Sequence, residues 1–239
     1  MNRTRTRSLG RGRSALTVLV AVVVTVVGVL LGCAPTVSRS ADEKPRAAPV
    51  PTSASVPPPA PAPAPTPVPR PRTAELDIPS IGVRDLRVVP YEGTTDDPAG
   101  TRIQDRGVAA SPYGKRGGVG PGDIGNYLVT AHRLSAGGPL RDLPAVDVGD
   151  RVFVTAGREV YEYRITETRT TSFRSARSLA EQRAAVPGAP GDKPTRAVIT
   201  LSTCATPEDN AAGNYWRDAQ GNPEHRIDKI GVLVAVRPA

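Results

Sequence analysis

A segment rich in proline and alanine divides this chain into a short N-terminal part and one foldable domain. Residues 34–72 show no periodic apolar pattern, and Pro and Ala alternate through much of residues 57–71. Proline lacks the backbone N–H that helices and sheets need, so this composition favours extended polyproline II over packing. We predict a disordered Pro/Ala-rich linker over residues 34–72, which leaves residues 73–239 for a single domain with one core.

The N-terminus has the composition of a membrane-targeting segment. Five arginines precede residue 14, and an uncharged apolar stretch follows over residues 15–31. This stretch is close to the minimum length that spans a bilayer, and positive charge before it keeps the N-terminus in the cytoplasm. We predict a basic cytoplasmic segment over residues 1–14 and a transmembrane anchor or lipoprotein-type signal segment over residues 15–33. The domain that follows is then extracellular, on the wall side of the cell membrane.

Three fates of the apolar segment stay open. It can be retained as a transmembrane helix, or it can be cleaved so that the domain is released. The sequence Leu30-Leu31-Gly32-Cys33 resembles the lipobox at which bacterial lipoproteins are cleaved and lipidated on the cysteine. The retained helix and the lipidated Cys33 both tether the domain to the membrane.

The net charge of +8 does not indicate nucleic-acid binding, because it is confined to the N-terminal part. Residues 1–72 contain ten Lys or Arg and two Asp or Glu, which leaves 21 of each kind in residues 73–239. A neutral domain lacks the basic footprint of a nucleic-acid-binding protein. Two histidines and one cysteine in that domain also fall short of a structural zinc site, and we expect no cofactor.

The domain has the sequence texture of a mainly β fold. Short runs rich in Val, Ile and Tyr recur between clusters of Gly, Pro, Asp and Ser, which predicts a closed barrel with one or two short helices. Residues 151–154 and 159–165 alternate around a Gly-containing turn and predict a hairpin. One helix is expected over residues 178–185, where Ser178 and Glu181 have capping-box spacing.

The lone cysteine of the domain, Cys204, is the candidate nucleophile. Secreted proteins usually pair their cysteines, so an unpaired thiol there is either a small buried side chain or a reactive group. The strand-like run over residues 196–203 leads into Cys204, and another such run ends near His132. Arg226 opens a third apolar run over residues 227–236. Thiol, imidazole and guanidinium groups at three strand ends form a set suited to acyl transfer.

These residues lie in motifs that resemble those of the sortases, the cysteine transpeptidases of Gram-positive cell surfaces. Thr200-Leu201-Ser202-Thr203-Cys204 matches the signature Thr-Leu-x-Thr-Cys around the sortase nucleophile. Other segments resemble the first strand, the segment after it, the histidine segment, and the following short helix: Asp77–Val83, Val88–Thr94, Thr130–Arg133 and Gly138–Leu143. The second of these is most similar to actinobacterial class E enzymes. The resemblance implies that the barrel has eight strands.

The resemblance also implies an activity. Sortases cleave a C-terminal sorting signal between Thr and Gly, in motifs such as Leu-Pro-x-Thr-Gly, through a thioester on the cysteine. Class E relatives favour Leu-Ala-x-Thr-Gly. The acyl group then passes to an amine, which for wall anchoring belongs to a peptidoglycan precursor. The implied roles are nucleophile for Cys204, acid and base for His132, and oxyanion donor for Arg226.

The position of the arginine departs from the family pattern. Relatives usually carry it about ten residues after the cysteine, whereas Arg226 follows after a segment, Thr206–Glu224, that reads as an enlarged loop. Arg217, inside that loop, and Lys229 are the competing candidates. We favour Arg226 because it leads into the apolar run of a final strand.

Two other functions remain as alternatives. An inactive sortase-like lipoprotein could bind wall components without turnover. A different cysteine acyl-transferase, such as an L,D-transpeptidase, is the other alternative. Those enzymes place the cysteine in a Ser-His-Gly-Cys context, which differs from Ser202-Thr203-Cys204.

Overall fold

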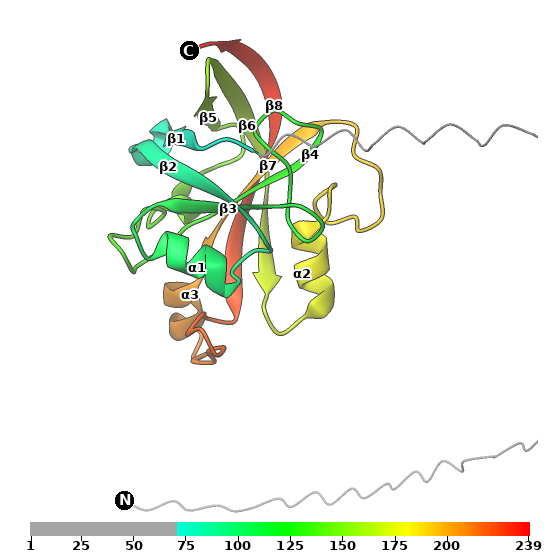
Figure 1. The fold of residues 1–239 in the computed structure, drawn as a ribbon. Helices are drawn as coiled ribbons and strands as arrows, with labels where there is room; N and C mark the ends of the chain where they lie inside the picture. The colour runs from blue at the N-terminus through cyan, green and yellow to red at the C-terminus, as the bar shows by residue number, and fades with distance from the viewer. Residues whose placement is uncertain (1–70) are drawn as a thin grey trace, which may run out of the picture. The chain divides into compact units, whose positions relative to one another are not determined.

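The short runs of β-branched and aromatic residues form eight strands that close into a barrel (Figure 1). The computed structural model describes residues 71–239. The strands are β1 Ala74–Ile78, β2 Val83–Glu92, β3 Ala109–Tyr113, β4 Gly125–Thr130, β5 Arg151–Ala156, β6 Glu159–Ser172, β7 Ala197–Cys204 and β8 His225–Pro238. The barrel and the β5–β6 hairpin are therefore confirmed.

The order of strands around the barrel decides which strand ends meet. That order is β1-β2-β3-β4-β7-β8-β6-β5, so β7 lies between β4 and β8. β4 and β7 run parallel, whereas β7 and β8 run antiparallel. The C-terminal ends of β4 and β7 and the N-terminal end of β8 consequently lie together at one end of the barrel.

Alternation along the central strands separates a core face from an outer face. Tyr127 and Val129 of β4 belong to the apolar core, as do Ile199 and Leu201 of β7. Successive side chains of a strand point to opposite faces, so Thr200, Ser202 and Cys204 lie on the outer face. The signature residues around the cysteine thus serve two purposes, filling the core and lining an outer polar layer.

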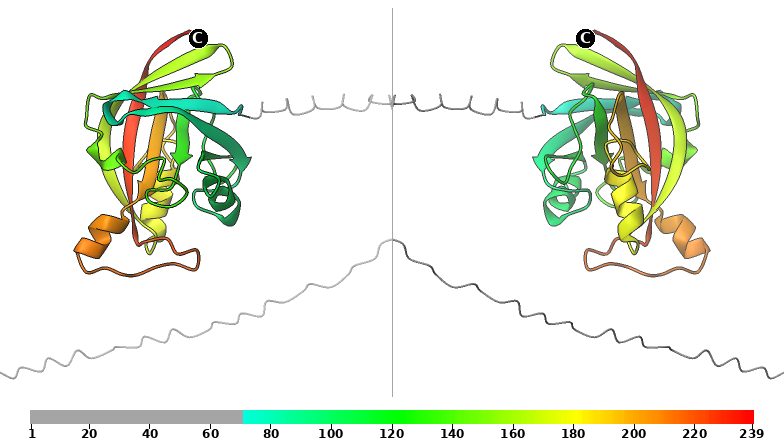
Figure 2. Two further views of the ribbon diagram at one scale, coloured as in Figure 1. Left: turned by 90° about the vertical axis from the view of Figure 1, so that its left-hand side faces the viewer. Right: turned by 90° about the vertical axis from the view of Figure 1, so that its right-hand side faces the viewer.

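Within residues 71–239, three short α-helices connect the strands, one more than the upper number expected from the sequence. They are α1 Pro98–Gln104, α2 Ala176–Arg183 and α3 Thr206–Ala211, with 3₁₀ turns at Pro79–Ile81 and Leu143–Ala145. The expected loop after Cys204 therefore begins with a helix. All three α-helices lie toward the end of the barrel at which β7 finishes, and α3 with the chain after it projects from that end (Figures 1 and 2).

The predicted capping of the second helix was wrong in its residues. Ser175 rather than Ser178 is the N-cap, and its side chain accepts a hydrogen bond from the Ser178 backbone N–H at 3.1 Å. Ser178 instead accepts from the Ser172 backbone N–H at 3.0 Å. Serine is a favoured N-cap residue, and both Ser175 and Ser178 meet that preference. The path of the preceding strand decides which of them begins the helix.

Two strand boundaries also differ from the prediction. The segment Asp77–Val83 is not one strand, because β1 ends at Ile78 and Pro79–Ile81 forms a 3₁₀ turn. Gly82 closes that turn with φ of 68°, a conformation that glycine adopts without strain. Arg226 lies inside β8 rather than just before it, since β8 begins at His225.

The predictions for residues 1–14 and 15–33, and for the linker before residue 71, lie outside the described residues. Within residues 71–239 no helix combines the length and apolarity needed to cross a membrane.

Candidate active site

Cys204 is the last residue of β7, where the strand delivers its thiol to the outer face of the barrel. The residue is free and nearly buried, with 8% of its surface exposed. It pairs directly with Arg226 of β8 in the antiparallel ladder. Directly paired residues of neighbouring strands project from the same face of the sheet. The strand register therefore makes the thiol and the guanidinium neighbours.

Arg226 is the best-buried large side chain of this region and faces the thiol. Its Nη1 donates a hydrogen bond to Cys204 Sγ at 3.0 Å, although the two residues are 22 positions apart. Its guanidinium carbon lies 4.9 Å from the centre of the Phe173 ring, which holds the planar group by a cation–π contact. Burial lowers the pKa of Arg226, but Asp96 and the other acidic neighbours raise it above its ordinary value, so the group stays charged.

His132 follows β4 on the other side of Cys204. Thr130 of β4 pairs with Ser202 in a parallel register, and two further residues along each strand bring His132 level with Cys204. The Ala131 N–H donates to the Ser202 carbonyl at 3.3 Å, which continues the ladder past the strand end. His132 Nε2 lies 2.9 Å from Asp105 Oδ1, a carboxylate that is 58% exposed.

A separate arginine ties the histidine segment to the cysteine segment. Arg133 Nη1 donates to the Cys204 carbonyl at 3.3 Å, and its two Nη atoms each lie 3.1 Å from an oxygen of Glu208 in α3. A bidentate arginine–carboxylate pair fixes geometry better than a single contact does. The ends of β4 and β7 and the start of α3 are therefore held in one arrangement.

The two competing cations lie elsewhere. Arg217 donates to the Trp216 carbonyl at 2.6 Å and to Asn210 Oδ1 at 2.8 Å, within its own loop. Lys229 is on the other face of β8, where Nζ donates to Thr168 Oγ1 at 3.0 Å and to the Pro144 carbonyl at 3.1 Å. The structure thus joins Cys204 to Arg226 and places His132 just past the end of the neighbouring strand, whereas Arg217 and Lys229 bond to other groups.

Asp96 also belongs to this cluster, and the sequence did not indicate it. Asp96, in the connection between β2 and α1, lies with Oδ1 2.5 Å from Arg226 Nη2, and both side chains are only 2% exposed. Asn222 Oδ1 also accepts from Arg226 Nη2, at 3.3 Å. No local pattern marks Asp96, because its partner lies 130 residues further along the chain and reaches it only through the barrel.

The thiol is kept in its neutral form by its surroundings. Burial raises the pKa of Cys204 above its ordinary value of 9.0, and the carboxylates of Asp96 and Asp218 add to this effect. Arg226 and Arg133 act in the opposite direction. The thiolate, which is the nucleophilic form, is therefore a minor species at neutral pH.

Alkylation of Cys204 should report this raised pKa. We expect the rate of reaction with iodoacetamide to rise with pH through a midpoint above 9.0, since only the thiolate reacts. The rate is measured on the full chain by mass spectrometry of the peptide that contains Cys204, with a short unstructured cysteine peptide as the reference. A midpoint below that of the reference would contradict the burial argument.

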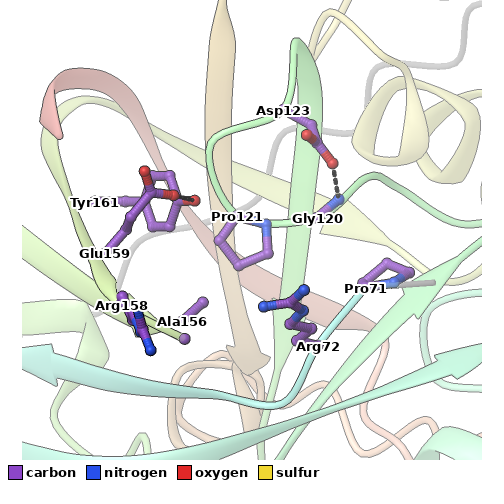
Figure 3. A pocket seen from close by; sticks show the side chains of 10 residues that line it. Pro71, Arg72, Gly120, Pro121, Asp123, Ala156, Arg158, Glu159 and Tyr161 are labelled. Carbon is purple, nitrogen blue, oxygen red and sulfur yellow. Dashed lines mark hydrogen bonds between the residues drawn. The ribbon is translucent and has the colours of Figure 1, made fainter. Parts of the chain in front are cut away.

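A cavity of about 520 Å³ lies at the end of the barrel opposite Cys204, and none of the candidate catalytic residues lines it (Figure 3). It is lined by residues before β1, before β4 and in the β5–β6 hairpin, among them Arg72, Arg158, Asp123 and Glu159. Its charges balance, and Tyr161 donates to Glu159 at 2.5 Å. Within residues 71–239 no cluster of three His, Cys, Asp or Glu side chains is placed to hold a metal ion.

A closed β-barrel with thiol, imidazole and guanidinium groups at adjoining strand ends defines a class of protein equipped for cysteine-dependent acyl transfer. The family model described as the Sortase domain matches residues 76–220. The chain therefore belongs to the sortase family of cysteine transpeptidases.

Solved structures share this fold. SrtA sortase from Actinomyces oris is 18% identical, with a TM-score of 0.53 and coverage of 72% of this chain and 86% of that one. Sortase E from Streptomyces avermitilis is 23% identical, with a TM-score of 0.51 and coverage of 70% and 91%. Sortase E1 from Streptomyces coelicolor, with a tripeptide in its active site, is 24% identical, with a TM-score of 0.50 and the same coverage. Among curated proteins, none matches the chain.

Proposed function

We propose that this chain is a membrane-tethered extracellular transpeptidase that joins secreted proteins to the cell wall. Its substrate is a C-terminal sorting signal of the type Leu-Ala-x-Thr-Gly or Leu-Pro-x-Thr-Gly, cleaved between Thr and Gly. The contact of 3.0 Å between Arg226 Nη1 and Cys204 Sγ is the observation that carries the proposal. A permanent cation beside the sulfur supports this proposal, because it can stabilise the negative oxygen that forms when the thiol attacks a carbonyl carbon.

In the first half-reaction Cys204 is acylated. The thiol proton passes to His132, and Sγ attacks the carbonyl carbon of the substrate threonine. The C–N bond to glycine then breaks, and His132 gives its proton to the departing amine. The products are a thioester on Cys204 and a released peptide that begins with glycine.

In the second half-reaction an amine takes the place of the lost glycine. The incoming amine, which we assign to a peptidoglycan precursor, attacks the thioester carbonyl and loses a proton to His132. The C–S bond breaks, and the proton returns to Cys204 as a new amide bond is completed. No proton or electron remains unbalanced over the cycle.

Arg226 stabilises the charge that develops in both half-reactions. Each tetrahedral intermediate carries a negative oxygen, and a donor already fixed beside that oxygen lowers the barrier without reorganisation. Burial strengthens this effect, because the guanidinium acts in a region from which water is excluded. The Sortase E1 structure with a tripeptide in its active site supports a peptide as the ligand of the corresponding region.

Membrane tethering rests on the sequence alone. The basic residues 1–14 and the apolar stretch after them favour an N-terminal anchor, either as a helix or through lipidated Cys33. The Pro/Ala-rich segment then acts as a spacer between the membrane and the barrel on the wall side.

Peptide transfer tests the proposal directly. The purified full chain in detergent is mixed with Leu-Ala-x-Thr-Gly and Leu-Pro-x-Thr-Gly peptides and an amine acceptor. We expect intact-mass spectrometry to detect a thioester adduct that disappears when the amine is added, with a new amide product. No adduct and no cleavage with either peptide would overturn the proposed activity.

Arg226 of β8 and Arg217 of the preceding loop should differ clearly in the same assay. We expect Arg226→Ala to lower kcat by about 10²- to 10³-fold, the usual loss when one oxyanion donor is removed. Arg217→Ala should keep kcat close to that of the wild type, because its bonds stay within its own loop. The reverse order would show that Arg217, not Arg226, serves the reaction.

Arg226→Ala also removes the partner of a buried carboxylate, so its folding needs a control. An unpaired buried charge typically costs about 3 to 5 kcal/mol. The double variant Arg226→Ala/Asp96→Asn removes that charge and should recover most of the lost melting temperature. Because the oxyanion donor is still missing, its kcat should remain low.

A further inference from the structure

The carboxylate of Asp96 makes the closest polar contact of Arg226. Asp96 Oδ1 lies 2.5 Å from Nη2 and also accepts from Gln104 Nε2 at 3.3 Å. The other carboxylate oxygen and Arg226 Nε are both buried without a hydrogen-bond partner. The pair therefore depends on one strong bond between Nη2 and Oδ1, while the neighbouring Nη1 of the same planar group faces Cys204.

The loop that carries Asp96 is held from two sides. On one side Thr95 Oγ1 donates to Gln182 Oε1 at 3.1 Å and accepts from Arg183 Nε at 2.8 Å, both residues of α2. On the other side Asp97 caps α1 by accepting from the Gly100 N–H at 2.8 Å. Asp96 thus sits on a fixed connection rather than on a free loop.

Gln182 connects this support to the strands beneath the thiol. Its Nε2 donates to Asp228 Oδ1 at 3.0 Å and to Ser202 Oγ at 3.2 Å. Ser202 is two residues before Cys204, and Asp228 is two residues after Arg226. The same polar network therefore ties the Asp96 loop to both strands that carry the site.

The backbone at Asp96 indicates that this position is imposed by its surroundings. Its φ is 59°, in the left-handed region that few residues other than glycine, asparagine and aspartate adopt. Neighbouring contacts select this conformation over the extended and right-handed ones. Here those contacts are the bonds of Thr95 and Asp97 on either side of it.

We propose that Asp96 is a positioning residue of this active site: its carboxylate holds the guanidinium of Arg226 in the orientation that presents Nη1 to Cys204. A free arginine side chain has several rotatable bonds and would distribute its donors among many orientations. The guanidinium is planar, so a buried carboxylate that fixes Nη2 also determines the direction of Nη1. This role rests on the proposed function, because it matters only if Arg226 binds the oxyanion.

The carboxylate has a second consequence for the thiol. The charged groups that act on Cys204 are Arg226 and Arg133, which favour the thiolate, and Asp96 and Asp218, which oppose it. Replacing Asp96 by asparagine removes one opposing charge but keeps an amide oxygen that can accept from Nη2. The pKa of the thiol should therefore fall.

The test uses the full chain with three variants. Asp96→Ala removes both the acceptor and the charge, and Asp96→Asn removes the charge alone. Asp97→Asn is the matched control, because it removes a charge from the adjacent residue while asparagine still caps the helix. Melting temperatures and circular dichroism establish that each variant is folded before it is assayed.

We expect Asp96→Ala to lower kcat for peptide transfer by about tenfold or more, with KM changed less than about twofold, since an oxyanion donor acts mainly in the transition state. In an Arg226→Ala background, Asp96→Ala should cause no further loss of kcat, because it acts only through that arginine. Asp97→Asn should behave as the wild type.

A readout without peptide separates this inference from the proposed function. Alkylation of Cys204 by iodoacetamide in Asp96→Asn should have its pH midpoint lowered, because one carboxylate that opposes the thiolate is gone. If no chain transfers peptide, the proposed function fails, and the midpoints of the two Asp96 variants then decide the positioning role. Both variants lack the carboxylate charge, but only Asp96→Asn keeps an acceptor for Arg226 Nη2, so the midpoint of Asp96→Ala should lie above that of Asp96→Asn. A wild-type kcat in folded Asp96→Ala, equal losses of kcat with and without Arg226, or equal midpoints in Asp96→Ala and Asp96→Asn would each overturn the positioning role.

Discussion

Replacing Cys204 by alanine is expected to abolish both the thioester adduct and the transfer of peptide to an amine. The reaction depends on a covalent bond to Sγ, so the loss should be on the order of 10⁶-fold in kcat, as for other enzymes deprived of their nucleophile. The fold should survive, because the thiol is a small side chain at a strand end. Intact-mass spectrometry and product chromatography measure the two losses.

The second cysteine of the chain supplies the control for that result. Cys33 is the only other thiol and lies outside the described residues. In detergent, Cys33→Ala should retain both the adduct and the transfer rate of the wild type. An adduct that remains in Cys204→Ala and disappears in Cys33→Ala would show that Cys33 is the nucleophile and would contradict the assignment of Cys204.

The β5–β6 hairpin was predictable because each of its strands buries one face. Alternation in β5 and β6 marks their inward residues, and the turn at Gly157 separates them, so that hairpin is visible in the sequence. The short helices were harder to predict from the sequence. α1 and α3 are only 7 and 6 residues long, too short for helical periodicity to appear. Their proline starts were signals, but proline is equally frequent in loops.

The pairing of Cys204 with Arg226 could be predicted only in part. Each residue lies at the edge of an apolar run, which placed both at strand ends. That these two strands are neighbours, with Cys204 opposite Arg226, follows from the antiparallel register of β7 and β8. The competing Arg217 was equally cationic, and only the path of the loop showed that it turns toward Asn210.

Asp96 illustrates what a single sequence does not reveal. Asp97 caps α1 and Pro98 begins it, but no role was predicted for this segment from the sequence. Asp96 therefore appeared as an ordinary loop residue. Its pairing with Arg226 arises because β2 and β8 are brought to one end of the barrel and α2 holds the loop there. Tertiary contacts between distant segments carry no local periodicity.

His132→Ala should be nearly inactive, with kcat lowered by about 10²- to 10⁴-fold, the usual contribution of a general acid and base. The loss should appear in both half-reactions, since the same imidazole protonates the leaving amine and deprotonates the incoming one. Single-turnover measurement of adduct formation, followed by discharge of the adduct with amine, resolves the two steps. Asp105 is mostly exposed, so removing it should have a small effect compared with removing His132.

The chain offers one other histidine as a matched control. His225 precedes Arg226 in β8, but its side chain is turned away from the thiol and its Nδ1 lies 2.6 Å from Asp209 Oδ1. His225→Ala should therefore lower the melting temperature, because it removes a partner of a nearly buried carboxylate, while kcat stays close to that of the wild type. Normal turnover in His132→Ala with a large loss in His225→Ala would exchange their roles. That outcome would require the reacting proton to travel along the α3 side of β8, where Asp209 rather than Asp105 would orient the imidazole.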